Sequence, residues 1–449
     1  MSESQYLTER LAAQILQYPS EALSAAIVGK AIDCVLDSVT SCLAGVAAQP
    51  TIAARQMAYS TFASGDTPVW FTQRRLSVVG ASWCNAMAAS SLDFDDGHRM
   101  ARGHPGSAII PAALAHASRK RCSTPQILAA IAIGYEVAIR SSAAQQYETA
   151  QTYQSGRWTG LGVVAACGRL AGLDRDQLSN ALAIAGVWAP NQQANGSSGY
   201  ARQTGNWAKE GVPISTVQAL MAIDLSRDGF TGPKDLLDHT SHYDYRPPIG
   251  EALEPTLILD TYFKRYACCR YIHPALDAYR SLTENVTLEA DSISRITVRT
   301  FAWALRLANK LRPENLVEVQ YSLPFCLAAL VLRGPAALSP ITQDLLHDDR
   351  IPALAARIDL EVCPAIDGRF SRETLAKVCV IFKAGYVLQS PRPIGPANLG
   401  RQDVRGKFRA LADGRISAPR CQQLLDAVEP DQCNLDELQH ILAQTTLSA

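Results

Sequence analysis

Residues suited to acid–base chemistry are concentrated in one stretch, SLDFDDGHRMARGHPGSAIIPAALA, which begins at Ser91. Twelve consecutive positions hold three carboxylates, two imidazoles and two guanidinium groups: Asp93, Asp95, Asp96, His98, His104, Arg99 and Arg102. Acid–base catalysis needs groups that titrate near neutral pH, and arginine matches carboxylates with a planar fork. The stretch is therefore a candidate active-site loop, and we take His104 as the proton carrier with Asp93 as its partner.

Two other interpretations of this stretch stay open. It can be a solvated polar loop whose aspartates cap a helix, because turn residues such as Gly97, Gly103 and Pro105 interrupt it. It can also bind a metal, since histidine and aspartate are metal ligands. The chain has no HxH or HExxH spacing here, so we expect no catalytic metal.

Cations gather at two further places. Lys209 precedes a predicted helix at Val212–Leu225 in GNWAKEGVPISTVQALMAIDLSRDGFTGP. A lysine at a helix N-terminus opposes the helix dipole, which favours a nearby anion, although an exposed loop lysine is the simpler alternative. The segment TYFKRYACCRYIHPALDAYRSL adds Lys264, Arg270 and His273. His273 can either serve a site or only fix the helix that follows it.

The elements that must position these residues are mainly helices. Apolar residues recur at helical steps in Ala22–Ala47, Pro111–Ser118 and Thr124–Ser142, and the uncharged, small-residue stretch Ala81–Leu92 predicts a tightly packed helix. Apolar and polar residues alternate, as in strands, in three later ranges: Ile293–Phe301, Arg357–Cys363 and Lys377–Phe382. A hairpin turn is predicted at residues 383–386, after the last of them. We predict a helical domain from residues 1–265 and 393–449, with an α+β lid domain, residues 266–392, inserted between them.

Composition limits the function classes. A chain of 449 residues is too long for one core, and its 42 basic and 42 acidic residues argue against nucleic acid or an anionic membrane as the partner. Its twelve cysteines form no CxxC pattern, which is typical of reduced thiols. We see no secretory signal and no membrane-spanning run, and we expect a cytoplasmic protein.

Four motifs resemble the MmgE/PrpD family. They are LDFDD followed by HPG and PAALA, the lysine segment ending in GFTGP, FKRYACCRYIHPALDA, and YSLPF with the later DVRGKFRALA. The family includes 2-methylcitrate dehydratases, cis-aconitate decarboxylases and iminodisuccinate epimerases. The resemblance implies a helical domain with an α+β lid, a homodimer and no cofactor.

The resemblance also implies site residues. By it, Asp93, His104, Lys209 and Lys264 are catalytic, and Tyr153, Arg270, His273 and Phe325 are predicted to bind substrate. Four further cations, which no family motif specifies, complete the predicted substrate-binding residues: Arg99, Arg102, Arg157 and Arg202. The chain departs from the family pattern at three positions. Gly97 stands where a threonine is common, Tyr153 where a histidine is usual, and Phe325 where a tyrosine is usual.

Clustered cations that hold carboxylates, beside a group that moves a proton, suit carbanion chemistry next to a carboxylate. Dehydration, decarboxylation and epimerisation all use such a site. We therefore expect a cofactor-independent lyase or isomerase for a small polycarboxylate, diverged from standard 2-methylcitrate dehydratase. The alternative is a non-catalytic, ligand-binding paralogue of the same fold, which the loss of histidine at Tyr153 would favour.

Overall fold

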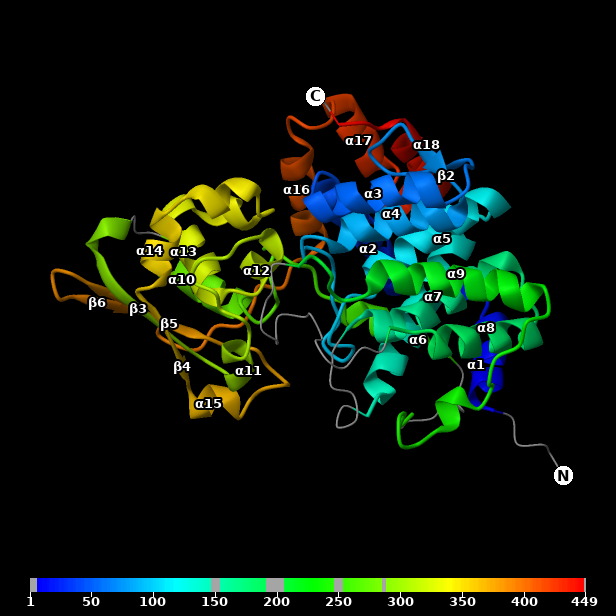
Figure 1. Cartoon of the computed structure of the whole chain (residues 1–449), viewed down its shortest axis with the longest axis horizontal. Helices are drawn as coiled ribbons and strands as arrows, with labels where there is room; N and C mark the ends of the chain where they lie inside the picture. The colour runs from blue at the N-terminus through cyan, green and yellow to red at the C-terminus, as the bar shows by residue number, and fades with distance from the viewer. Residues whose placement is uncertain (1–5, 147–153, 191–205, 246–252, 285–287, 448–449) are drawn as a thin grey trace.

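The computed structural model describes residues 6–146, 154–190, 206–245, 253–284 and 288–447. Two bodies lie side by side in Figure 1: a larger helical body, and a smaller body that combines helices with a sheet. We call the second the mixed body. The cavity described below lies where they meet.

The first half of the chain is helical, with one short strand pair. Its elements are α1 (Leu7–Gln17), α2 (Ala25–Gly45), α3 (Gln49–Thr61), β1 (Thr67–Pro68), β2 (Arg75–Leu76), α4 (Val78–Ser90), α5 (Gly106–Lys120), α6 (Thr124–Ala144), α7 (Gly156–Ala171), α8 (Arg175–Val187) and α9 (Val212–Arg227). The predicted helices are confirmed, with ends shifted by a few residues. The largest shift is in α5, which begins at Gly106 rather than at Pro111.

Small residues let the central helices approach closely. A methyl group placed at Gly45 in α2 would lie 2.0 Å from the carbonyl oxygen of Ala88 in α4. One at Gly162 in α7 would lie 2.5 Å from the carbonyl oxygen of Gly134 in α6. Such contacts leave no room for larger side chains. They fix α4 and α5, and with them the two ends of the loop that carries Asp93 and His104.

One of these core helices also passes a simple test for membrane spans. By length and composition α6 could cross a membrane, and so could the bent pair α2 and α3. In α6, however, 89% of the most apolar window is buried inside the protein. The apolar composition of α6 is therefore explained by its place in the core of the protein.

The second half supplies the mixed body. Its elements are α10 (His273–Thr283), β3 (Ile293–Thr300), α11 (Ala302–Leu305), α12 (Leu316–Gln320), α13 (Leu323–Arg333), α14 (Arg350–Ala355), β4 (Ile358–Val362), α15 (Pro364–Asp367), β5 (Lys377–Phe382) and β6 (Val387–Gln389). The sheet order is β4-β3-β5-β6. Strand β3 is parallel to β4 and antiparallel to β5, and the predicted hairpin joins β5 to β6, with Ile381 opposite Val387.

The chain then returns to the helical body through α16 (Arg401–Ala412), α17 (Ala418–Asp426) and α18 (Leu435–Gln444). Helix α16 packs on α2, where Arg401 Nε lies 2.6 Å from Asp33 Oδ1, and α18 packs on α5 (Figure 1). The mainly helical class is thus confirmed, with small sheets added. The domain limits at residues 265 and 392, and the role of the mixed body as a lid, stay predictions.

Candidate active site

The loop that joins α4 to α5, residues 91–106, contains the first group of candidate residues, and we call it the reaction loop. Asp93 has a φ of +54°, in the left-handed region, which aspartate tolerates better than most residues and which is often found at functional sites. The backbone of Gly97 pairs with that of Tyr262 through two hydrogen bonds of 3.0 and 2.9 Å. This pairing brings the segment with Lys264 beside the reaction loop.

The position of Gly97 explains one departure from the family pattern. A methyl group there would lie 2.4 Å from the hydroxyl oxygen of Tyr262, so the tyrosine ring fills the space of a larger side chain. The Arg270 guanidinium in turn lies 4.2 Å from the centre of that ring. The phenol group of Tyr262 therefore occupies the space that a side chain at position 97 would need.

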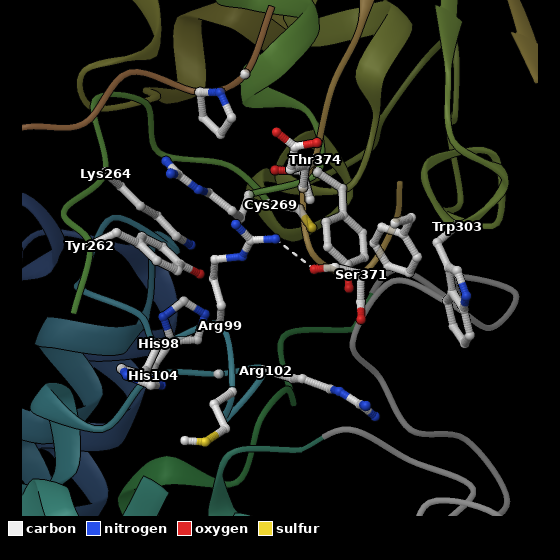
Figure 2. Close-up of a pocket in the computed structure, with 18 of the residues that line it drawn as sticks. His98, Arg99, Arg102, His104, Tyr262, Lys264, Cys269, Trp303, Ser371 and Thr374 are labelled. Carbon is white, nitrogen blue, oxygen red and sulfur yellow. Dashed lines mark hydrogen bonds between the residues drawn. The ribbon is translucent and has the colours of Figure 1, made fainter. Parts of the chain in front are cut away.

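A cavity of about 960 Å³ lies against the reaction loop, between the two bodies (Figure 2). The charged residues that the helical body and the Tyr262–Arg270 segment contribute are Asp93, Arg99, Arg102, His104, Glu210, Lys264 and Arg270. The mixed body adds two more charged residues, Arg372 and Glu373. The mixed body contributes Trp303 and residues 370–375. Arg99 Nη2 donates a hydrogen bond of 2.5 Å to the carbonyl oxygen of Ser371, across the cavity.

Asp93 is the centre of the charged group. Its Oδ1 atom lies 2.9 Å from Lys264 Nζ, 3.2 Å from His104 Nε2 and 3.8 Å from Lys209 Nζ. Burial alone would raise the pKa of Asp93, but the two ammonium groups and the hydrogen bond from His104 hold it well below its usual value. Asp93 is therefore ionised, and the pKa of Lys264 is raised despite burial because Asp93 is so close.

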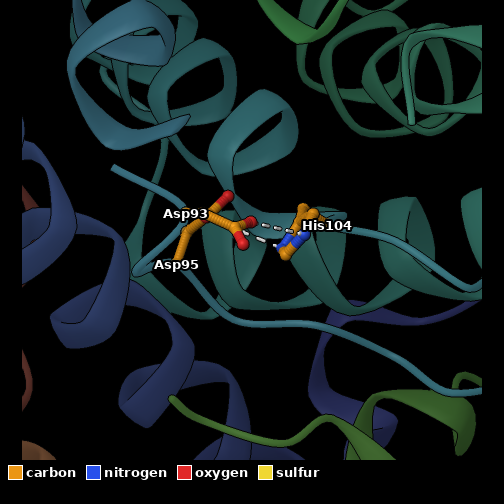
Figure 3. Close-up of side chains that lie close together, drawn as sticks. All are labelled: Asp93, Asp95 and His104. Atoms are coloured by element: carbon orange, nitrogen blue, oxygen red, sulfur yellow. Dashed lines mark ion pairs between the residues drawn. The ribbon is translucent and has the colours of Figure 1, made fainter. Parts of the chain in front are cut away.

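His104 lies beside two acidic side chains of its own loop, Asp93 and Asp95 (Figure 3). Its Nδ1 is 2.6 Å from the carbonyl oxygen of Asp96 and 3.6 Å from Asp95 Oδ1. A carbonyl only accepts, so Nδ1 must carry hydrogen. Nε2 faces the ionised Asp93, which also accepts a hydrogen, so the ring is protonated on both nitrogens.

The pKa of His104 agrees with this assignment. Burial and Lys264 both favour the neutral ring, but the negative charges of Asp95 and Asp93 outweigh them and raise the pKa to about 9. At neutral pH the histidine is an imidazolium ion. It is ready to give a proton rather than to take one.

Buried groups behind the reaction loop hold its backbone. Tyr135 donates to Asp96 Oδ2 at 2.5 Å, and the Gly106 N–H donates to Asp96 Oδ1 at 3.1 Å. Burial and the nearby charge of Asp37 raise the pKa of Asp96 to about 7. From α16, Lys407 Nζ donates to the Phe94 carbonyl oxygen at 2.7 Å and lies 2.8 Å from Asp37 Oδ1.

Lys209 reaches Asp93 from the segment before α9. Its Nζ donates a hydrogen bond of 2.8 Å to Gln320 Oε1, so the mixed body also helps to hold it. The next residue, Glu210, accepts from the hydroxyl and backbone N–H of Ser155 at 3.0 and 2.9 Å. The same hydroxyl accepts from the His104 backbone N–H at 3.1 Å. The Lys209 segment and the reaction loop are therefore tied together through Ser155.

Asp93, Asp95 and His104 also offer ligand atoms within 4.8 Å of one another, a spacing that suits a metal ion. Metal binding requires a neutral imidazole, whereas His104 is protonated here. A cation would also have to displace the ammonium of Lys264 from Asp93. The donor chemistry therefore favours an anionic ligand beside these groups over a metal ion.

Most of the predicted residues come together. Asp93, His104 and Lys264 line the cavity and contact one another, and Lys209 lies beside Asp93. The predicted binding residues Arg99, Arg102 and Arg270 also line the cavity. The Nη1 atom of Arg270 is buried and has no hydrogen-bond partner among the described residues, so it can bind an anion. Tyr153 and Arg202 lie outside the described residues.

Three predicted substrate contacts, His273, Phe325 and Arg157, are not among the described residues that line the cavity, and their role in binding stays a prediction. His273 is buried at the start of α10, with Nε2 3.3 Å from the Cys268 carbonyl oxygen, and burial holds its pKa well below the usual value. Phe325 is buried in α13. Arg157 donates to Gln145 Oε1 at 3.3 Å. Helix packing, rather than spacing in the sequence, decides where these side chains lie.

Among the residues that line the cavity, His98 and Tyr262 were given no individual role from the sequence, although His98 was named as part of the candidate loop. His98 lies in the reaction loop, and burial lowers its pKa to about 4, so its ring is neutral at pH 7. Tyr262 directly precedes the Phe-Lys motif. Their place within or beside the motifs is the only signal in the sequence that points to them.

Known proteins match this chain along most of its length. Residues 9–244 match the MmgE/PrpD N-terminal domain, and residues 266–430 match the MmgE/PrpD C-terminal domain. The chain is 27% identical to human cis-aconitate decarboxylase over 404 residues, which is 83% of this chain and 80% of the relative. It is 26% identical to the mouse protein of that name over 387 residues, 79% of this chain and 76% of the relative.

A third relative has a different name. Over 294 residues the chain is 23% identical to 2-methylcitrate dehydratase of Cupriavidus necator, which is 61% of this chain and 60% of the relative. The two domain matches together cover most of the chain, from before the reaction loop to beyond α16. The chain therefore belongs to the MmgE/PrpD family and is an enzyme of that family.

Proposed function

We propose that this enzyme is a cofactor-independent lyase that decarboxylates a small unsaturated polycarboxylate, with His104 as the proton donor. The observation that carries the proposal is the double protonation of His104. Its Nδ1 donates to a backbone carbonyl and its Nε2 faces the ionised Asp93. Decarboxylation consumes a proton, so the resting enzyme must hold an acid, whereas dehydration or epimerisation begins when a base removes a proton.

Binding would place the carboxylates of the substrate against the cations of the cavity. Lys264 is buried beside Asp93, and Arg270 presents a buried, unpaired Nη1 atom. Arginine and lysine in a site largely shielded from water stabilise anionic charge more strongly than they would in water. A substrate with two or three carboxylates can therefore be held at one end while it reacts at the other.

The chemical step then breaks one carbon–carbon bond. A carboxylate attached one carbon away from a C=C bond leaves as CO₂, and its bonding electron pair forms a new C=C bond. The original double-bond pair moves to the carbon beside a second carboxylate, and the charge there would be stabilised by Lys264 and Lys209, which both lie beside Asp93. That carbon takes the proton from His104 Nε2, and solvent later returns a proton to the ring.

The matches to the relatives favour decarboxylation over dehydration. The two cis-aconitate decarboxylases match over more of their length than the 2-methylcitrate dehydratase does. Dehydration stays the second candidate, because Asp93 and a deprotonated His104 could together serve as the general base. A homodimer and a cytoplasmic location also stay predictions.

Turnover in D₂O tests the proposal. The purified chain is incubated separately with cis-aconitate and with 2-methylcitrate, and the products are analysed by mass spectrometry. We expect cis-aconitate to yield CO₂ and an unsaturated diacid with one deuterium on carbon, and His104→Gln to slow this by about 10²–10⁴-fold. Water loss from 2-methylcitrate without CO₂ release would favour dehydration, and turnover of neither acid would favour the binding-only alternative.

A further inference from the structure

Tyr262 is a cavity residue to which the proposed reaction assigns no role. It precedes Lys264 by two positions, and the side chains of both reach the reaction loop. Lys264 Nζ lies 2.9 Å from Asp93 Oδ1, and the Tyr262 ring lies against Gly97. In Figure 2 both side chains extend in the same direction, toward the part of the cavity that carries His104. Tyr262 is therefore placed to act on the same ligand as Lys264.

The ring of Tyr262 is held by two neighbours, and neither holds it through a hydrogen bond to the hydroxyl. A methyl group at Gly97 would lie 2.4 Å from the phenol oxygen and 2.5 Å from the carbon that bears it, so the tip of the ring lies directly against the loop backbone. The Arg270 guanidinium lies 4.2 Å from the ring centre, in a cation–π contact. A phenylalanine ring would keep the packing and the cation–π contact. Holding the ring in place therefore does not require the hydroxyl.

The hydroxyl of Tyr262 has no hydrogen-bond partner among the described residues, and the buried Nη1 atom of Arg270 shares this property. Polar groups inside folded proteins are almost always hydrogen-bonded, so a ligand or water must satisfy these two donors. Burial raises the pKa of the Tyr262 phenol although Lys264 and Arg270 oppose the shift, so the phenol keeps its proton at neutral pH. Two free donors and the Lys264 ammonium thus border the same part of the cavity.

We infer that Tyr262 is a catalytic residue whose hydroxyl donates a hydrogen bond to the substrate carboxylate beside Lys264 and Arg270, and so stabilises the charge that collects there. The inference rests on the proposed function, because this charge arises only after CO₂ has left and before His104 gives its proton. In that interval the electron pair is shared between the carbon and the carboxylate oxygens. A fixed donor to those oxygens interacts more strongly as their charge grows, so it speeds the chemical step more than it tightens binding.

Tyr262→Phe in the full chain tests the inference, because phenylalanine keeps the ring beside Gly97 and Arg270 and removes only the hydroxyl. With cis-aconitate we expect kcat to fall about 10–100-fold and KM to change by less than about threefold. The fall in kcat/KM above about pH 9 should persist, since His104 is still the proton donor. Steady-state kinetics across the pH range measures all three quantities.

Tyr279→Phe is the matched control. Tyr279 is a buried tyrosine of α10 and is not among the described residues that line the cavity. This variant loses the same chemical group as Tyr262→Phe, but away from the substrate, so kcat and KM should stay unchanged. Thermal unfolding confirms that each variant is folded.

The outcomes separate the two proposals. If the unmodified chain decarboxylates cis-aconitate and folded Tyr262→Phe keeps its kcat within about threefold, the inference is overturned and the proposed function stands. Loss of the fall above about pH 9 in this variant would also overturn the inference, because Tyr262 would then be the proton donor in place of His104. If the unmodified chain releases no CO₂ from cis-aconitate, the proposed function fails, and the inference that depends on it fails as well.

Discussion

The two sides of the cavity are built in opposite ways. On the reaction-loop side, charged groups are buried and held by hydrogen bonds from several elements, as Asp93 is by Lys264, His104 and Lys209. On the mixed-body side, the half-buried rings of Tyr271, Trp303 and Phe370 contact one another through their edges and faces. Preorganised charge of the kind that acid–base chemistry needs is thus built into the reaction-loop side, whereas apolar packing holds these three rings together.

The largest effect should come from the proton donor itself. His104→Gln keeps a polar side chain of similar reach but cannot donate from an imidazolium ion. We expect kcat to fall by about 10²–10⁴-fold with little change in thermal stability. Steady-state kinetics and thermal unfolding measure the two effects. A loss of less than about tenfold in a folded variant would show that the reaction-loop side does not perform the proton transfer.

The next largest effect should appear at the support behind the reaction loop. Lys407→Met leaves Asp37 buried and without its ammonium partner and removes the donor to the Phe94 carbonyl oxygen. Breaking a buried pair from one side costs about 3–5 kcal/mol, so the free energy of unfolding in urea should fall by that amount. kcat should fall as well, because Phe94 lies between Asp93 and Asp95.

The double variant Lys407→Met with Asp37→Leu is its control. Removing both charges should recover much of the stability. It should not recover kcat, because the hydrogen bond to the Phe94 carbonyl oxygen is still absent. Full recovery of activity would mean that α16 supports the fold but does not position the reaction loop.

A pH profile tests whether the reaction-loop side acts as an acid. The folded pKa of His104 is about 9, above the ordinary value of 6.5, so the proton donor is present below pH 9 and is lost as pH rises through that value. We expect kcat/KM to fall about tenfold per pH unit above roughly pH 9. Asp95→Asn removes a charge that raises the pKa of His104, so the fall in kcat/KM should begin at a lower pH. A rise in kcat/KM through the same range would indicate a base instead of an acid.

The smallest effect should appear at the far edge of the sheet. Arg295 Nη1 lies 2.8 Å from Asp359 Oδ2, and both side chains are exposed. Such surface pairs contribute about 0–1 kcal/mol. Arg295→Ala should therefore change the free energy of unfolding in urea by less than about 1 kcal/mol and leave kcat/KM unchanged. A larger change in kcat/KM would show that the sheet is coupled to the cavity.

Local spacing in the sequence was enough to predict the helices, the strands and the reaction loop. Periodicity predicted α2, α6 and α9, alternation predicted β3 and β5, and turn residues predicted a loop between α4 and α5. These features depend on neighbouring residues, which a single sequence displays directly. The concentration of acids, histidines and arginines at residues 93–104 likewise identified the site from residue types alone.

How these groups meet depends on the tertiary structure. Asp93 and Lys264 are 171 positions apart, and their 2.9 Å contact depends on the pairing of Gly97 with Tyr262. The same packing buried His273 and Phe325 and raised the pKa of His104, because that pKa depends on which charges lie beside the ring. Residue types and spacing specify what chemistry is available, whereas distances and burial, which arise from long-range packing, decide which of it is used.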